Sequence, residues 1–275
     1  MNRHSLIWIV CLLPVLMLLP FPASAEENSV QADRPGLGTG PAVLGFGDIQ
    51  WETGFEEAFS PGIHLVALPA TLFRFGLHER VELRMEYEGV LTVYDNLPGK
   101  REVQYIPEHL LLGTKLMLWQ GSTDKHLRWI PKTSMMLQLG IPTTKELVDE
   151  RPVIGMIDLL FENEVTNWFS VGYDVGAHWL EWKPEPDVFA SLSLNFQPTE
   201  QWGCFIENFN YFEFHPSAAL NTVYNVFLDF GITYSPHPRV QLDVNAGFNC
   251  YDSEPLLCGP KNFAFAGLGI AWKLR

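Results

Sequence analysis

Apolar and polar residues alternate with a period of two along many short stretches of the chain. In the clearest stretch, apolar residues from Val81 to Val93 alternate with a polar set that includes Glu82, Arg84 and Glu86. A period of two places the two sets on opposite faces of a β-strand. Because clusters of Gly, Pro, Asn and Asp separate these stretches, the pattern predicts an all-β chain.

The alternation identifies about twelve candidate strands. They lie near residues 47–59, 63–75, 80–94, 106–119, 129–141, 152–162, 168–179, 188–197, 202–213, 222–234, 239–249 and 262–274. Short turns are expected between alternate pairs of strands, and outward loops between the others, among them residues 95–104. Strands of about ten residues in an even number are typical of membrane barrels. The sequence therefore predicts an antiparallel transmembrane β-barrel over residues 47–275.

Alternation alone is also compatible with a soluble fold. In a soluble sheet the apolar face is the core, whereas in a membrane barrel it meets lipid and the polar face lines the lumen. The polar phase is rich in charge and glycine on nearly every strand, which favours the membrane barrel. Aromatic residues near predicted strand ends also fit interfacial girdles, for example Trp119, Trp168, Trp202 and Trp272. A soluble periplasmic β-barrel binding protein is kept as an alternative.

Residues 1–25 have the three parts of a cleaved signal peptide. A short basic region with Arg3 precedes the apolar run Leu6–Leu19, and small residues at Ala23–Ala25 form the cleavage site. Residues 26–46 are predicted to be a periplasmic leader, called the leader segment below. Its Asp33-Arg34 pair, followed by Pro35, motivates the hypothesis that the segment enters the barrel mouth as a partial plug.

Composition restricts the partners of this chain. The 18 Lys and Arg residues are outnumbered by 32 Asp and Glu residues, which gives a net charge of −14. Nucleic acid binding requires clustered basic residues, so no nucleic acid partner is expected. Hydrophobic residues make up 47% of the chain, which excludes a disordered acidic protein.

The polar phases of the strands supply the candidate lumen. If they point inward, the lumen is lined by nine acids and three bases: Glu52, Glu56, Arg74, Glu82, Arg84, Glu86, Glu88, Lys115, Asp158, Asp174, Asp229 and Asp243. Such a lining forms either a passage for cations and polar solutes or a network of ion pairs that closes the barrel.

The remaining chemistry is sparse. Cys250 and Cys258 flank the last outward loop, and export to an oxidising compartment predicts a disulfide between them, while Cys204 is left over. The histidines are scattered, so neither a metal site nor a cofactor is expected. No Gly-x-Ser-x-Gly motif is present, and we predict that the protein is not an enzyme.

Several short motifs together resemble a known family. They include Asp33-Arg34-Pro35, Gln50-Trp51-Glu52-Thr53-Gly54, Leu72-Phe73-Arg74-Phe75-Gly76-Leu77, Gly172-Tyr173-Asp174-Val175-Gly176 and Phe205-Ile206-Glu207. In order and spacing they are similar to the outer-membrane barrels labelled "transporter" or "meta-pathway of phenol degradation". The resemblance covers nearly the whole chain after the signal.

This resemblance implies a place and a role. The place is the outer membrane of a Gram-negative envelope, with outer-membrane lipid and the barrel assembly machinery as partners. The role is porin-like passive uptake or export of small-molecule solutes, including apolar or aromatic compounds. A non-conducting structural or adhesive barrel is the alternative, although the short predicted outward loops do not favour adhesion.

Overall fold

Twelve strands form the structure, a computed structural model that describes residues 29–60, 62–97, 100–122, 129–145, 154–179, 185–214, 222–252 and 263–275. The strands are β1 (Ile49–Ser60), β2 (Ile63–His78), β3 (Val81–Leu97), β4 (Lys100–Trp119), β5 (Lys132–Ile141), β6 (Ile154–Thr166), β7 (Phe169–Trp179), β8 (Asp187–Phe196), β9 (Trp202–Phe214), β10 (Thr222–His237), β11 (Val240–Asp252) and β12 (Ala264–Lys273). The signal peptide and Cys258, with its predicted disulfide, lie outside the described residues.

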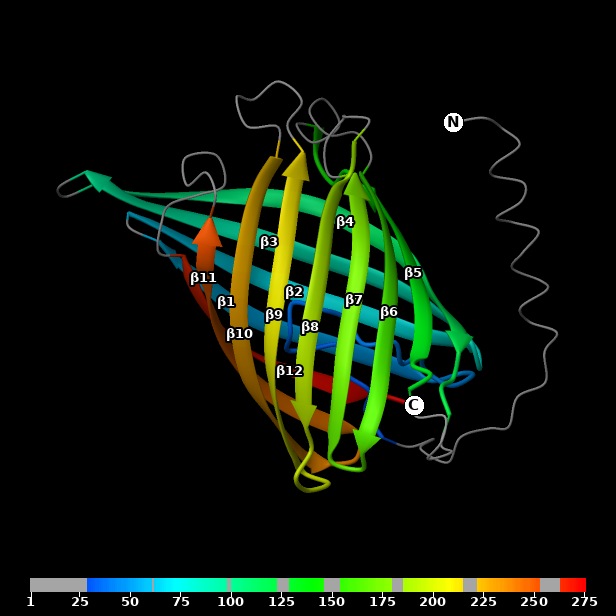
Figure 1. The fold of residues 1–275 in the computed structure, drawn as a ribbon. Helices are drawn as coiled ribbons and strands as arrows, with labels where there is room; N and C mark the ends of the chain where they lie inside the picture. The colour runs from blue at the N-terminus through cyan, green and yellow to red at the C-terminus, as the bar shows by residue number, and fades with distance from the viewer. Residues whose placement is uncertain are drawn as a thin grey trace.

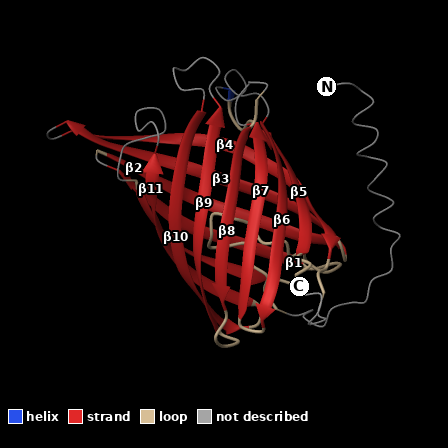
Figure 2. Cartoon of the chain, viewed as in Figure 1, coloured by secondary structure: helices blue, strands red, loops and turns tan. Residues whose placement is uncertain are grey.

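The strands close into one barrel (Figures 1 and 2). Each strand pairs antiparallel with its neighbour in sequence, and β12 closes the barrel on β1 through a register that includes Trp51 opposite Trp272. This closure leaves no free sheet edge along the barrel wall, as a membrane requires. The predicted antiparallel barrel of about twelve strands is confirmed. No helix in the described residues is long and apolar enough to span a membrane.

One predicted loop is instead strand. Residues 95–104 were expected to form an outward loop, but the β3–β4 pairing continues through Val93 opposite Val103 and ends at Leu97 opposite Lys100. The prediction was wrong because cross-strand hydrogen bonds extend a hairpin even where local alternation is weak. On its other side, β4 pairs with β5 only from Leu110 onward, so the β3–β4 ribbon extends past β5.

Burial on the barrel wall is inverted relative to a soluble protein. On β3, the apolar Leu83 and Met85 are 43% and 42% exposed, whereas Glu82 and Arg84 are 0% and 5% exposed. The same inversion occurs around the barrel, with Leu139, Ile206, Phe230 and Leu268 among the exposed residues. An apolar exterior around a polar interior is the arrangement of a membrane barrel and disfavours the soluble alternative.

Aromatic residues gather at the end of the barrel with the short turns, called the turn end below. Trp119, Trp168, Trp202 and Trp272 are all exposed there. Trp202 also packs against Tyr234, with ring centroids 4.5 Å apart. Amphipathic rings at this level fit a membrane interface, which places one boundary of the apolar band.

The described part of the leader segment, which begins at residue 29, runs through the inside of the barrel (blue trace in Figure 1). It enters beside the β10–β11 turn, where the Val30 N–H donates to the Pro238 carbonyl over 2.7 Å. It reaches β9 and β7, turns back to β4 and β5, and leaves through a turn at Gly47 (φ 81°) into β1. The described leader residues thus form a loop across the lumen near the turn end.

Candidate functional site

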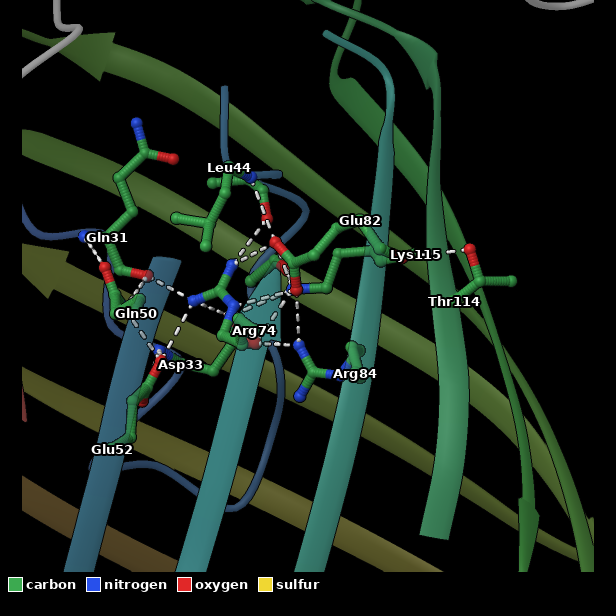
Figure 3. A network of polar contacts seen from close by, with 12 residues as sticks. Gln31, Asp33, Leu44, Gln50, Glu52, Arg74, Glu82, Arg84, Thr114 and Lys115 are labelled. Atoms are coloured by element: carbon green, nitrogen blue, oxygen red, sulfur yellow. Dashed lines mark hydrogen bonds and ion pairs between the residues drawn. The ribbon is translucent and has the colours of Figure 1, made fainter. Parts of the chain in front are cut away.

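A cluster of buried charges lies on the lumen face of β1–β4 (Figure 3). The Arg74 guanidinium donates two parallel hydrogen bonds to the Glu82 carboxylate, both over 2.8 Å, and a third to Glu52 over 3.0 Å. Arg84 also donates to Glu82, over 3.1 Å. Paired guanidinium and carboxylate groups of this kind are among the stronger polar contacts in proteins and fix the side chains in place.

Asp33 of the leader segment completes this cluster (Figure 3). Its carboxylate accepts hydrogen bonds from Arg84 and from Lys115 Nζ, the latter 2.9 Å from both oxygens, and lies 3.6 Å from Arg74. The cluster then holds three cations, Arg74, Arg84 and Lys115, and three carboxylates, Asp33, Glu52 and Glu82. The leader therefore supplies the third negative charge of the cluster, which balances its three positive charges.

The charge state of Asp33 follows from these contacts. Burial by itself would raise the pKa of the Asp33 carboxyl, but the positive charges of Arg74, Lys115 and Arg84 outweigh burial and hold the pKa below its usual range. Asp33 is consequently ionised at neutral pH, and its attraction to the wall is undiminished there.

Carboxylates of the wall also bind the backbone of the leader. Glu52 accepts the N–H groups of Asp33 and Arg34 over 3.1 and 3.2 Å. On the opposite wall, Glu207 accepts the N–H groups of Leu37 and Gly38 over 2.8 and 3.0 Å. Irregular backbone inside a membrane protein needs such partners, because water does not satisfy every group at this depth.

The outermost part of the loop and its return leg have partners of their own. Thr39 N–H donates to Asp174 Oδ2 over 3.0 Å. On the way back, Lys115 Nζ donates to the Gly40 carbonyl over 2.8 Å, and Ser134 Oγ donates to the Pro41 carbonyl over 2.5 Å. The loop is therefore held at both walls rather than resting against one.

Glycines in the wall make room for Arg34. A Cβ atom added to Gly54 or to Gly269 would lie 2.4 Å from the Arg34 guanidinium. Both glycines face the lumen on adjacent strands, β1 and β12, and stand opposite each other in the register. This close approach lets Arg34 reach Asp243 on β11, with Nη2 3.4 Å from Oδ1.

The leader segment lies between two cavities. The turn-side chamber, about 600 Å³, is bounded mainly by β6–β9 near their turns and includes Ser170, Ser193 and Asn195. The loop-side chamber, about 340 Å³, lies toward the other end of the barrel and includes Glu86 and Phe189. Asp33, Arg34, Gly36, Gly38 and Thr39 line both chambers. The leader thus forms the partition between them.

The structure places the twelve predicted lumen residues as follows. Nine are buried: Glu52, Arg74, Glu82, Arg84, Lys115, Asp158, Asp174, Asp229 and Asp243. Glu56 and Glu86 are half-buried, and the more exposed Glu88 lines the loop-side chamber with Glu86. The five buried members on β1–β4 form the cluster around Asp33, whereas Asp158, Asp174 and Asp229 lie on the far wall. Pro35, the third predicted leader residue, lines the turn-side chamber.

Sequence reasoning missed several lumen residues. Glu207 binds the leader but was not in the candidate set, because the apolar Phe205 shares its inward phase and hides the alternation of β9. Gln50, which accepts the Gln31 N–H over 3.0 Å, is fully buried and was also missed. Both belong to motifs of the family resemblance, so the signal was present in the sequence.

No group of three or more His, Cys, Asp or Glu side chains in the described part of the chain could hold a metal ion. The side chains of Cys204 and Cys250 are exposed.

The comparisons with known proteins agree with this architecture. The family described as "Putative MetA-pathway of phenol degradation" matches residues 32–256. The fold is similar to that of the COG4313 outer membrane channel from Pseudomonas putida F1, with a TM-score of 0.60 and 11% identity over 88% of this chain and 99% of that one. It is also similar to the NanC porin, with a TM-score of 0.56 and 6% identity over 82% and 100% of the two chains. No curated protein sequence matched. At these identities the structural likeness establishes the fold alone.

Proposed function

This chain belongs to the "MetA-pathway of phenol degradation" family, and from that premise we propose that it is an outer-membrane channel for passive movement of small molecules. The observation that carries the proposal is the pair of chambers inside an apolar-surfaced barrel, at about 600 and 340 Å³. Volumes of about 300–1,000 Å³ are typical of cavities that accept small molecules. The direction of transport follows the solute gradient, as in any passive pore.

The leader segment acts in this proposal as a partial plug. It separates the chambers. The part from Asp33 to Pro41 is held by ion pairs and hydrogen bonds, whereas Val43 and Leu44, nearer to β1, are buried apolar residues. Water that enters the chambers replaces the hydrogen bonds of residues 33–41 when this part moves away from the walls, while Val43 and Leu44 stay buried. Displacement of the leader would join the chambers into one wider path.

The cellular setting is part of the same proposal. A cleaved signal peptide would direct the chain to export, and the assembly machinery would insert the barrel into the outer membrane, where lipid contacts the exposed apolar band. The exposed tryptophans at the turn end support this placement, because aromatic girdles mark the edges of the apolar band in outer-membrane barrels.

A non-conducting structural barrel is the second candidate. The observation that favours it is the balanced cluster around Arg74, because a lumen crossed by buried ion pairs resembles a permanent filling. The two candidates differ in whether ions pass, which makes conductance the deciding measurement.

Conductance of the purified, folded protein in planar bilayers tests the proposal. We expect small, stable current steps from the intact mature chain, and steps about twofold larger or more when residues 26–46 are deleted. Absence of current from both proteins would overturn the channel and favour the structural barrel. Equal currents would retain the channel and overturn the plug. Heat-dependent gel mobility and membrane fractionation, run in parallel, establish that each sample is a membrane-inserted barrel.

A further inference from the structure

The loop-side chamber differs from the rest of the lumen in having apolar walls. Besides Leu37 of the leader and the small Ala70, seven larger apolar side chains line it. They come from β2, β4, β5, β6, β8 and β9: Leu72, Leu111, Met136, Met156, Leu160, Phe189 and Phe209. Phe189 and Phe209 are stacked with ring centroids 5.3 Å apart, and His178 packs on Phe189 at 4.6 Å. This surface inside a polar barrel offers a place for the apolar part of a solute.

Carboxylates line the same chamber on two sides. Glu86 and Glu88 come from β3, and Asp158 and Asp174 come from β6 and β7. The cations that line it have partners already: Arg84 is bonded to Asp33 and Glu82. Likewise, Arg34 is paired with Asp243, and His178 Nε2 lies 2.8 Å from Asp158.

Glu86 and Glu88 form no ion pair within 4 Å in the described part of the chain, and Arg84 and Arg34 act on them only from farther away. Glu86 accepts a hydrogen bond from the uncharged amide of Gln138 over 3.2 Å. The charged groups with the largest effect on Glu88 are three further carboxylates, Glu56, Glu86 and Glu108, and one cation, Arg34. A positive solute entering from the loop end would lower this repulsion.

Asp174 gives a second and independent indication of a ligand. Its side chain is deeply buried, with a relative exposure of 6%, and its Oδ2 accepts the Thr39 N–H. Its Oδ1 has no hydrogen-bond partner in the described structure. A buried carboxylate oxygen without a donor is costly, and Asp174 borders the loop-side chamber as well as the turn-side chamber, so a donor that reaches this oxygen removes that cost.

We propose that the loop-side chamber binds an amphipathic organic cation, namely an amine that carries an aromatic or short aliphatic group. The ammonium lies against the chamber carboxylates, and the apolar group packs against Phe189, Phe209 and Met156. A metal ion fits less well, because hard cations require a shell of six or more oxygens, whereas this chamber presents scattered carboxylates between apolar walls. A neutral aromatic molecule gains only the apolar contacts, and an anion meets the carboxylates.

The proposal deepens the proposed channel function, since the bound amine would be a transported solute, but binding can be measured without transport. The test is isothermal titration calorimetry on the full mature chain in nanodiscs of zwitterionic lipid, with empty nanodiscs as the blank. Phenethylamine, phenethyl alcohol and 3-phenylpropionate serve as cationic, neutral and anionic probes of similar size. We expect the amine to bind about tenfold more tightly than the alcohol, the ratio given by one charge-assisted hydrogen bond, and the anion to give no heat. Equal affinities, or tighter binding of the anion, would overturn the proposal.

Substitutions locate the site. Glu88→Gln and Glu86→Gln should each weaken amine binding by about fivefold or more and leave the alcohol unchanged. Phe209→Ala should weaken both probes. Glu102→Gln is the matched control, because Glu102 lies on the exposed β3–β4 ribbon, and it should change neither. If Glu88→Gln and Glu86→Gln behave like Glu102→Gln, the chamber is not the amine site.

Planar-bilayer currents from the same samples separate this inference from the channel proposal. Amine binding without current would overturn the channel and keep the site. Current without preference for the amine would keep the channel and overturn the site. Heat-dependent gel mobility of each variant confirms that the barrel has folded before either result is read.

Discussion

The two walls that hold the leader segment do so by different chemistry. On β1–β4, the leader contributes the Asp33 carboxylate to a cluster in which three cations face three carboxylates. On β7–β9, the leader contributes only backbone N–H groups to the carboxylates of Asp174 and Glu207. The cluster on the first wall is balanced in charge, so this wall is called the balanced wall below, whereas the second wall is acidic. Attachment of the leader to the first wall therefore requires the Asp33 side chain. Attachment to the second wall requires only that the leader backbone follows the same path.

The difference extends to β10 on the acidic side. Asp229 is fully buried directly opposite Glu207 in the register, and neither of its carboxylate oxygens has a partner in the described structure. Two carboxyl groups that are buried side by side without a cation are costly to ionise together. The acidic wall thus lacks the ion pairs that stabilise the balanced wall.

The largest expected effect comes from breaking the balanced wall. Arg74→Met removes the shared partner of Glu52 and Glu82 and leaves two buried carboxylates without it. We expect the free energy of unfolding to fall by about 3–5 kcal/mol, measured by urea titration in lipid vesicles. Lys145→Met, at an exposed position, is the control and should change little. A loss for Arg74→Met no larger than that of the control would contradict a stabilising role for this wall.

The second prediction compares the two attachments of the leader. Asp33→Asn leaves three cations facing two carboxylates, so the leader should detach and single-channel conductance should rise by about twofold or more. Glu207→Gln should raise conductance much less, because an amide oxygen still accepts the Leu37 and Gly38 N–H groups. Equal effects from the two variants would show that the walls hold the leader alike.

A third and smaller effect tests the close approach of Arg34. Gly269→Ala places a methyl group 2.4 Å from the guanidinium, which has to swing away from Asp243. We expect a modest rise in conductance, smaller than that of Asp33→Asn. Gly40→Ala is the matched control within the leader, since a Cβ there meets no atom within 4 Å. Identical currents from Gly269→Ala and the unaltered protein would indicate that Arg34 has no part in holding the leader.

The smallest effect concerns pH. The folded pKa of Asp33 lies below its ordinary value of 3.8, because Arg74, Lys115 and Arg84 outweigh the effect of burial. The stabilisation it provides is therefore fully present above that value and is lost only as pH falls toward the folded pKa. The conductance difference between the unaltered protein and Asp33→Asn should stay constant from about pH 7 to about pH 5. A difference that disappears within this range would exclude an ionised Asp33 as the attachment.

The sequence by itself determined the barrel, because the alternation of apolar and polar residues with a period of two is a local property. It does not depend on which strands pair with each other. It predicted the twelve strands and the burial of residues such as Glu82 and Arg84 on the inward phase. It also singled out Asp33 and Arg34, since a charged pair in a glycine-rich leader is unusual. The prediction failed at residues 95–104, where pairing with a neighbouring strand decides the structure and local pattern does not.

Only the tertiary structure decided which of these residues meet. Asp33 reaches Lys115, 82 positions away, and Leu37 reaches Glu207, 170 positions away, because closing the barrel brings distant strands around one narrow lumen. The apolar loop-side chamber likewise depends on residues that point inward, such as Phe189 and Phe209. Because most inward residues of this barrel are polar, the alternation alone does not identify these apolar residues as inward. Strand alternation depends only on residues that are neighbours in the sequence. Charge balance and cavity lining depend on residues from different strands, which become neighbours only when the barrel closes.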